Sequence, residues 1–316
     1  MSTTSASPDE PTILPVTAID EARHEPGPEP FWSESWYFDF FAPDGSIGGW
    51  VRLGLYPNLG VAWYHAYLVG PGRQTIAVSD LEVALPKVPS LEIRSSGLWA
   101  DHICETPLDH WTLGNEAQGL GVDDPATLYE PTPRGEIVPV AFDLEWETAG
   151  TPYHYVHTTR YEVPCTVHGE ILVGDERIEL DGYGQRDHSW AVRDWWTIQW
   201  VWTAGRLDDG LRFHASDIRI PGVDIGFGYV QPGDGSMSVT NAVHADEQLG
   251  AEGFPDAGTI DIGGLALGIE PIAFAPSLLT YEDKVDRFPR ALCRFTAEDG
   301  RAGLGWTEWN QPQGLT

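Results

Sequence analysis

The chain has 316 residues, 41% of them hydrophobic, and 18 Lys and Arg stand against 48 Asp and Glu for a formal net charge of −30. This charge argues against binding of nucleic acid or an anionic membrane surface, because both require basic residues, and it weakly disfavours anionic substrates. The length suits two domains better than one.

The first thirty residues are polar, acidic and rich in proline, which predicts a disordered or loosely ordered arm over residues 1–30. They lack the basic start and apolar core of a signal peptide. No apolar run of about 20 residues occurs that could span a membrane. Three widely spaced cysteines without a CxxC pair favour reduced thiols. We therefore expect a cytoplasmic protein without a membrane span.

The body of the chain has the pattern of β-strands separated by turns. Residues 35–41 are aromatic and strand-like, a Pro-Asp-Gly turn follows, and residues 48–56 and 61–69 continue as strands. In the third strand, the period of two places Trp63, His65 and Tyr67 on one face. Both faces of this strand are rather apolar, so we expect it to be covered on both sides.

Later hairpins are equally clear, and convincing helices are scarce. The predicted strand pairs, each around a Gly-containing turn, are 166–173 with 177–182, 195–207 with 211–220, 226–231 with 236–243, and 291–297 with 301–309. Many short strands predict an all-β protein of two antiparallel barrels or sandwiches packed together. We place the N-terminal domain at 31–178 and the C-terminal domain at 179–316.

Residues 182–196 hold the densest group of side chains that can do chemistry. Three tryptophans lie close to the charges, and each has a large apolar area to bury. The charges are therefore expected beside apolar surface, where pKa values shift. The alternatives are a structural salt-bridge cluster and a ligand or catalytic site. The segment contains Arg186, Asp187, His188, Trp190, Arg193, Asp194, Trp195 and Trp196.

Two short motifs resemble a known family. Trp36-Tyr37 in the first strand, and Asp187-His188-Ser189-Trp190 after a glycine-rich stretch, are similar to the two-domain lipocalin-like (calycin-like) family of carotenoid 1,2-hydratase (hydroxyneurosporene synthase) and AttH-like proteins. Ser35 departs from that pattern by replacing a Trp, and the Arg-Asp-His-Ser-Trp run is typical of an uncharacterised bacterial branch. The resemblance implies two lipocalin-like barrels, the second opening at the Asp-His segment, and an apolar, isoprenoid-like or polyketide-like ligand without a metal.

These residues suggest a cofactor-free hydratase, dehydratase or isomerase acting on an isoprenoid, steroid or similar apolar substrate. Hydration of an alkene requires an acid in a dry pocket, for which Asp187 is the candidate, with His188 or Asp194 as base. Aromatic faces would stabilise the carbocation. We expect a pocket of about 300–1,000 Å³ beside Asp187. The residues expected to bind the substrate are Arg186, Trp190, Arg193, Trp195, Trp196, Trp36, Tyr37 and His65.

A regular strand would complicate this hypothesis, because Asp187 and His188 would then lie on opposite faces. They could act together only across a bulge, which Gly182 and Gly184 would permit. Without a bulge, His188 would become the better catalytic candidate. Asp187 would then anchor the backbone or pair with an arginine such as Arg193.

The remaining expectations are alternatives and absences. No cluster of histidines with metal-ligand spacing occurs, so we expect no metal and no cofactor, and the motifs of serine hydrolases and nucleotide-binding enzymes are missing. The partner is a hydrophobic small molecule, and a homodimer is allowed. Two other functions stay open: a non-catalytic lipocalin-type carrier of a hydrophobic molecule, and a carbohydrate-active β protein, whose carboxylates would lie about 5–10 Å apart across a wet groove.

Overall fold

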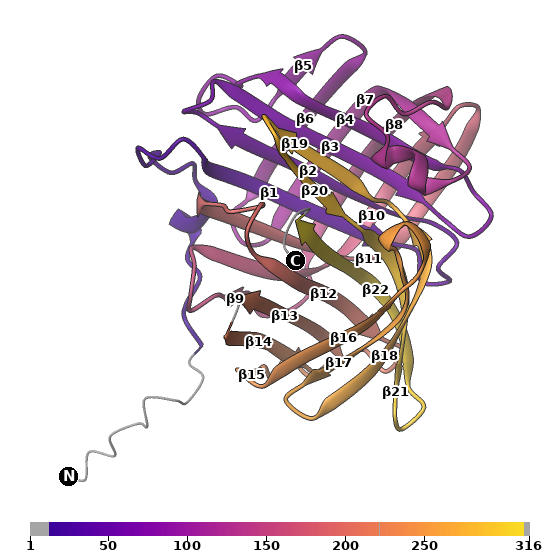
Figure 1. Ribbon diagram of the computed structural model, residues 1–316. Coiled ribbons are helices and arrows are strands. Elements are labelled where there is room, and N and C mark those ends of the chain that lie inside the picture. Colours follow the sequence, from indigo (N-terminus) through magenta and orange to yellow (C-terminus); the bar gives the residue numbers. More distant parts are fainter. Residues whose placement is uncertain (1–12, 221, 313–316) are drawn as a thin grey trace.

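The computed structural model describes residues 13–220 and 222–312, and β-strands dominate this part of the chain (Figure 1). The strands form two 11-stranded antiparallel sheets, which confirms the all-β prediction. Three short 3₁₀ helices accompany them, at η1 (Ala18–Glu21), η2 (Pro125–Tyr129) and η3 (Ala251–Gly253). Within the described ranges, no helix is both long and apolar enough to cross a lipid bilayer.

The first sheet curves into a nearly closed barrel. Its strand order is β4-β3-β2-β1-β11-β10-β8-β7-β6-β5, with β9 beside β10, and β4 also pairs with the end of β7. The strands are β1 (Trp32–Phe41), β2 (Gly48–Tyr56), β3 (Val61–Val69), β4 (Thr75–Ala84), β5 (Ile93–Ser95), β6 (Leu98–Thr106), β7 (His110–Val122), β8 (Glu136–Thr148), β9 (Tyr153–His154), β10 (Arg160–Val173) and β11 (Glu176–Val192).

The second sheet packs against the first. Its order is β15-β14-β13-β12-β22-β21-β18-β17-β16, and a hairpin of β19 and β20 is attached through β22. The strands are β12 (Gln199–Leu207), β13 (Arg212–Ile220), β14 (Val223–Gln231), β15 (Ser238–Thr240), β16 (Val243–Leu249), β17 (Pro255–Ile262), β18 (Leu265–Phe274), β19 (Ser277–Tyr281), β20 (Lys284–Phe288), β21 (Arg290–Ala297) and β22 (Ala302–Pro312).

The change from one sheet to the other falls between β11 and β12. Strand β11 pairs with β1 and β10, so it lies in the middle of the first sheet. The Asp187-His188 segment therefore does not open the second barrel, and that expectation is wrong. The predicted boundary between 178 and 179 lies inside β11, and the division into domains at that point stays a prediction.

The two sheets meet across an aromatic interface that buries both faces of the central strands. In β1, Trp36 and Phe38 face the interior of the first barrel, whereas Tyr37 packs toward the second sheet. Two indoles cross the interface: Trp50 Nε1 donates to the Ala275 carbonyl at 3.2 Å, and Trp306 Nε1 donates to the Phe40 carbonyl at 3.0 Å. This double burial explains why every residue of β1 is buried, including the polar Ser33, Ser35 and Asp39.

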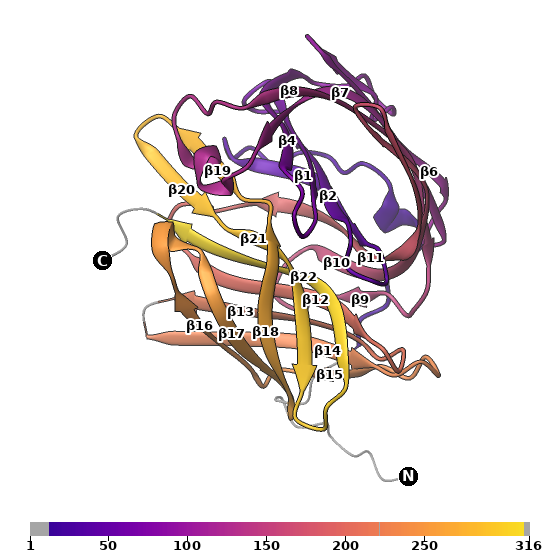
Figure 2. The same cartoon turned by 90° about the vertical axis from the view of Figure 1, so that its right-hand side faces the viewer.

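The β19–β20 hairpin extends from the second sheet over the first barrel (Figure 2). Leu279 and Phe288 of the hairpin pack with Trp63 of β3 and with Trp195. Only two residue pairs join β20 to β22 in the described chain. The hairpin thus covers the first barrel while it is held to its own sheet by a short ladder.

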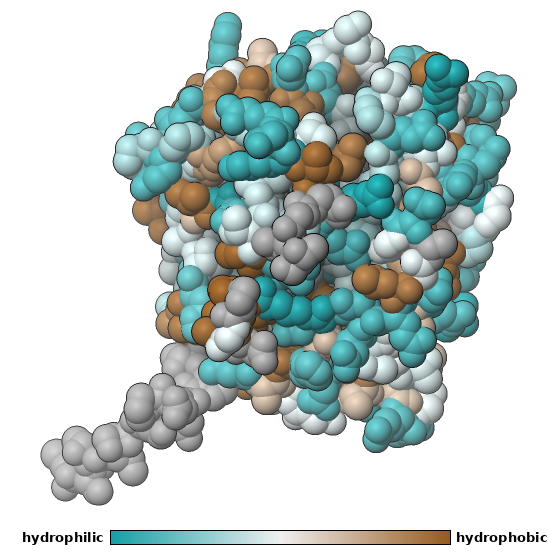
Figure 3. All heavy atoms as spheres, in the orientation of Figure 1, coloured by the Kyte–Doolittle hydropathy of each residue, from teal (hydrophilic) through white to brown (hydrophobic). Residues whose placement is uncertain are grey.

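Part of the expected loose arm is anchored in the first barrel. Glu21 is 6% exposed and lies 2.8 Å from Arg186 Nη2 as a buried ion pair, and Trp111 Nε1 donates to it at 3.0 Å. The ring of His24 stacks on Trp190 at 3.8 Å. Residues 1–12 of the arm lie outside the described residues. Elsewhere the exposed face is largely hydrophilic with small hydrophobic patches, in keeping with the high net charge (Figure 3).

Candidate functional site

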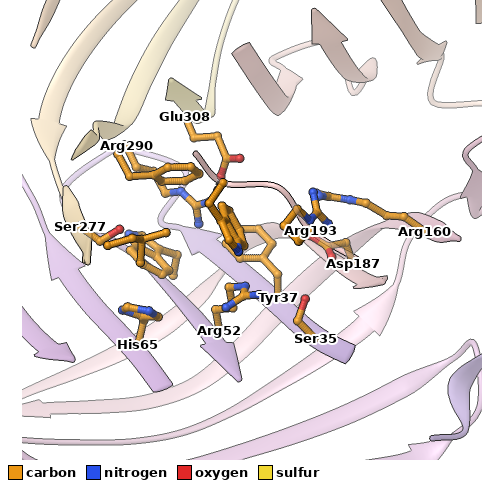
Figure 4. A pocket seen from close by; sticks show the side chains of 14 residues that line it. Ser35, Tyr37, Arg52, His65, Arg160, Asp187, Arg193, Ser277, Arg290 and Glu308 are labelled. Carbon is orange, nitrogen blue, oxygen red and sulfur yellow. Dashed lines mark hydrogen bonds and ion pairs between the residues drawn. The ribbon is translucent and has the colours of Figure 1, made fainter. Parts of the chain in front are cut away.

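A cavity of about 30 Å³ lies between the first barrel and the second sheet (Figure 4). A cavity of this size holds about two water molecules, so it is smaller than the expected pocket, and its lining is more polar. The side chains that line the cavity come from β1–β3, β10, β11, the segment before β12, and β19–β22. They are Ser35, Tyr37, Trp50, Arg52, His65, Arg160, Asp187, Arg193, Trp195, Ser277, Leu279, Phe288, Arg290 and Glu308.

Asp187 faces this cavity because β11 is a regular strand. Asp187 is paired with Tyr37 of β1 on one side and with Glu162 of β10 on the other, in a single register without a bulge. Side chains of a strand alternate, so Asp187 points toward the second sheet and His188 toward the barrel interior. The expectation that a regular strand would favour His188 did not include the position of this cavity, which lies on the face of Asp187, and the catalytic role of either residue stays a prediction.

The carboxyl of Asp187 is 4% exposed, and its Oδ2 accepts a hydrogen bond from Arg160 Nη2 at 2.8 Å. Burial raises the pKa of Asp187 to about 7, although the charge of Arg160 opposes the rise. No other hydrogen bond to this carboxyl comes from the described residues. A carboxyl that titrates near neutral pH can both give and take back a proton, which general acid–base catalysis requires.

A buried network on the far side of Arg160 keeps that guanidinium in place. Glu162 accepts hydrogen bonds from Arg160 Nε at 2.9 Å, Tyr155 Oη at 2.7 Å and Trp202 Nε1 at 3.0 Å. Burial alone would raise the pKa of Glu162, but the charge of Arg160 and these donors lower it overall. Glu162 is therefore an ionised anchor for Arg160, which in turn fixes the carboxyl of Asp187.

Three further arginines point into the cavity (Figure 4). Arg290 is paired with Glu308, and its guanidinium lies 4.4 Å from the ring of Trp50. Arg52 and Arg193 both lie over the ring of Trp195, at 5.1 and 5.3 Å. Burial, followed by the neighbouring charges of Arg160 and Arg52, lowers the pKa of Arg193 to about 10.

His65 completes the polar lining on the side of β3. Its Nδ1 lies 3.2 Å from Ser79 Oγ, and the side chain is almost completely buried. Burial, followed by the charges of Arg52 and Arg290, lowers the pKa of His65 to about 3. The imidazole is therefore neutral at physiological pH and contributes a hydrogen-bonding group but no charge.

Five of the predicted residues are brought together at the cavity, and the others lie elsewhere. Asp187, Tyr37, His65, Arg193 and Trp195 line it, whereas Trp196 packs beside Phe31 at the edge of the same aromatic cluster. Asp194 accepts hydrogen bonds from the backbone of Trp196 and Thr197, so it stabilises a turn. The barrel side of the first sheet holds Arg186, His188, Trp190 and Trp36.

His188 belongs to a second polar cluster inside the first barrel. Glu34 Oε1 lies 2.8 Å from His24 Nδ1 and 3.1 Å from His188 Nε2, while His188 Nδ1 donates to the Asp20 carbonyl at 2.8 Å. Two imidazoles and a carboxylate at this spacing could hold a metal ion, and the carbonyl would orient the ring of His188. An exposed group of Glu145, Glu147 and His168 has a similar spacing. The expectation of no metal stays a prediction.

The sequence argument missed most of the charged lining: Arg52, Arg160, Arg290 and Glu308. These residues lie far apart in the chain. Arg52 had one usable signal, because it stands between Val51 and Leu53 in an apolar strand, and a buried charge there requires a partner or a function.

Comparison with solved structures places this architecture among two-domain β proteins. The chain is similar to a putative AttH from Nitrosomonas europaea (15% identity, TM-score 0.54, 96% of this chain and 99% of that one). It is also similar to kievitone hydratase from Nectria haematococca (12%, 0.62, 94% and 93%) and to CghA (10%, 0.59, 98% of each). At these identities the likeness shows a shared fold. No curated protein matches the sequence.

One family model matches nearly the whole chain. It covers residues 17–313, which include the anchored part of the arm, both sheets and every residue that lines the cavity. The chain therefore belongs to the family defined by the domain of unknown function DUF7064.

Proposed function

We propose that the protein is a cofactor-free acid–base enzyme that adds water to, removes water from or cyclises a small unsaturated molecule in the cavity between the sheets. The observation that supports this most strongly is Asp187, a buried carboxyl at the cavity whose pKa is raised to about 7. The fold adds support, because one structural neighbour is by name a hydratase.

The arginines favour one kind of alkene over another. Protonation of an isolated alkene creates a carbocation, which aromatic faces stabilise but the guanidinium groups of Arg52, Arg160 and Arg193 repel. An alkene conjugated to a carbonyl instead develops negative charge on oxygen, which the same guanidinium groups stabilise. We therefore replace the carbocation hypothesis by a conjugate addition or its reverse.

One carboxyl is sufficient for this reaction. The water oxygen bonds to the alkene carbon remote from the carbonyl, and the electron pair of the double bond moves toward the carbonyl oxygen. As that pair returns, the carbon next to the carbonyl takes the proton of Asp187. The added water gives its surplus proton to the Asp187 carboxylate, so the acid is restored and one H₂O has been added. Dehydration follows the same steps backwards.

The hairpin of β19 and β20 controls access in this proposal. A cavity of about 30 Å³ has no room for a whole substrate, and Ser277, Leu279 and Phe288 of the hairpin form part of its wall. Among the described residues, the strand pairing between the hairpin and its sheet is limited to Asp286 and Arg287 with β22. Outward movement of the hairpin would break few backbone hydrogen bonds and enlarge the cavity.

The other two functions have less support. A lipocalin-type carrier holds its ligand inside the barrel, and here large aromatic side chains occupy the interior, among them Trp36, Phe38, Trp111 and Trp146. A carbohydrate-active site would use an open, wet groove, whereas this cavity lies between the packed sheets and has Leu279 and Phe288 of the hairpin in its wall.

The experiment is incubation with a panel of isoprenoid and polyketide enones and unsaturated acids in ¹⁸O-labelled water, followed by mass spectrometry. We expect at least one compound to gain a labelled water, and Asp187→Asn to lower that rate by about 10²–10⁴-fold with an unchanged circular dichroism spectrum. Asp143→Asn, on the outer face of β8, is the control. Equal rates for wild type and Asp187→Asn would rule out Asp187 as the acid.

A further inference from the structure

The cavity has more positive than negative charge. Four guanidinium groups line it, from Arg52, Arg160, Arg193 and Arg290. Two carboxyl groups also line it, from Asp187 and Glu308. Glu162, which binds Arg160 from behind, is a third carboxylate. With Asp187 ionised, four cations face three anions, and with Asp187 in the acid form that the proposed reaction uses they face two. The cavity region therefore has an excess of positive charge, although the whole chain has a net charge of −30.

Two of these arginines have no carboxylate partner among the described residues. Arg160 is paired with Asp187 and Glu162, and Arg290 with Glu308, but no ion pair includes Arg52 or Arg193. Arg193 donates to Ser189 Oγ at 3.2 Å, and no hydrogen bond from Arg52 to a described residue is present. Burial of an unpaired guanidinium is costly, so an anion bound here would stabilise Arg52, which is buried, and Arg193, which is half-buried.

Arg290 also offers free donors. Its Nε and Nη1 are buried and lack a hydrogen-bond partner, although Glu308 accepts from the same guanidinium. Glycine at position 54 leaves room for Arg52, because a Cβ there would lie 2.6 Å from Arg52 Nη1. The unused donors of three arginines thus converge on one small, enclosed space.

We propose that the cavity binds the carboxylate group of an unsaturated acid through Arg52, Arg193 and Arg290. An anion offsets this excess positive charge, and planar guanidinium groups match the two oxygens of a carboxylate. Tyr37 and Trp50 then contact the carbon chain. This assignment rests on the proposed function, since it places the double bond next to Asp187, but binding itself does not require turnover.

The test is calorimetric titration of the whole protein with crotonate and with crotonamide, its uncharged counterpart. We expect crotonate to bind, crotonamide to bind at least tenfold more weakly, and Arg52→Gln and Arg193→Gln each to weaken crotonate binding at least tenfold. Arg94→Gln, an exposed arginine, is the control. Equal binding of crotonate and crotonamide, or no binding of either, would overturn the proposal. Acetate binding as tight as crotonate would show an adventitious anion only and would overturn it as well.

A second measurement separates a binding role from a structural one. Arg52→Gln removes an unpaired buried charge, so the ligand-free variant should melt at a higher temperature than the wild type, while crotonate should stabilise it less. A variant that melts lower and binds crotonate normally would show that Arg52 is merely structural. If crotonate binds through the arginines while Asp187→Asn leaves turnover intact, the catalytic proposal fails and the carboxylate site stands.

Discussion

Asp187 and His188 are neighbours in the chain, yet their side chains lie on opposite faces of β11, one at the cavity between the sheets and the other inside the first barrel. This separation predicts different consequences for the two positions. His188→Gln should lower the free energy of unfolding by about 1–3 kcal/mol, because Glu34 and the Asp20 carbonyl lose their partner. Its turnover should stay within a few-fold of wild type in assays at a temperature where it is folded. A loss as large as that of Asp187→Asn would place His188 in the reaction.

The pH dependence of the rate should follow Asp187. The acid form gives the proton, so kcat/KM for hydration should fall about tenfold per pH unit above about 7. The charge of Arg193 lowers the pKa of Asp187, and Arg193→Gln should therefore move the start of this fall to higher pH. Rate profiles of both proteins measure the effect, with Arg94→Gln as control. A fall that begins at the same pH in all three would contradict the assignment.

The protein should become less stable as the pH rises, because of Asp39. Burial raises the pKa of Asp39 to about 8, whereas the unfolded chain releases this proton near pH 3.9, roughly its ordinary value. Between these values the folded state binds a proton that the unfolded state has lost. The free energy of unfolding therefore falls as pH rises, by at most about 1.4 kcal/mol per unit for this group. Urea denaturation across this range should show a shallower dependence for Asp39→Asn, and an unchanged slope would refute the prediction.

The anchored part of the arm should contribute to the stability of the first barrel. Glu21→Gln removes the charge that compensates Arg186, a residue that is 2% exposed. Breaking one partner of a buried pair costs about 3–5 kcal/mol. Urea denaturation should show this loss for Glu21→Gln and little change for Glu25→Gln, which alters an exposed residue of the same arm. Similar stability of the two variants would mean that Glu21 is dispensable.

Hydrogen exchange should identify the β19–β20 hairpin as a mobile cover. Its amides should exchange faster than those of β1 and β11, because only a short ladder joins β20 to β22. A bound ligand beneath the hairpin should slow this exchange. Exchange in the hairpin that is as slow as in β1, with or without ligand, would argue for another route into the cavity.

Turn chemistry made much of the fold predictable. Asp209-Gly210 predicted the hairpin now seen in β12 and β13, and Gly210 has the positive φ, 89°, that such a turn requires. The faces of β11 at the site were not predictable, because residues 185–189 are buried on both faces and polar side chains occur on each, so polarity does not mark the solvent side. Its place in the first sheet depends on contacts with β1, about 150 residues away, which the local pattern does not encode.

The candidate site was predictable mainly where its residues cluster in the chain, and Tyr37 and His65 were added from two aromatic strands. Asp187, Arg193 and Trp195 come from one dense segment, and the cavity contains all three. Arg290 and Glu308 come from two strands of the second sheet that are adjacent in space, and each looks like an ordinary charged residue in the sequence. Their pairing beside Arg52 is a product of the packing of the two sheets.

The arginine-lined cavity attracts an approaching anion, whereas the rest of the molecule repels it. With a net charge of −30, the exterior repels a carboxylate at long range, whereas attraction operates only at close quarters. At 0.1 M salt, charges on the exterior are screened beyond about 10 Å, so their repulsion of the ligand weakens. The attraction by the buried arginines is screened far less. Association should therefore accelerate with ionic strength, the reverse of ordinary electrostatic steering, so this protein would capture its ligand fastest in a medium of high salt.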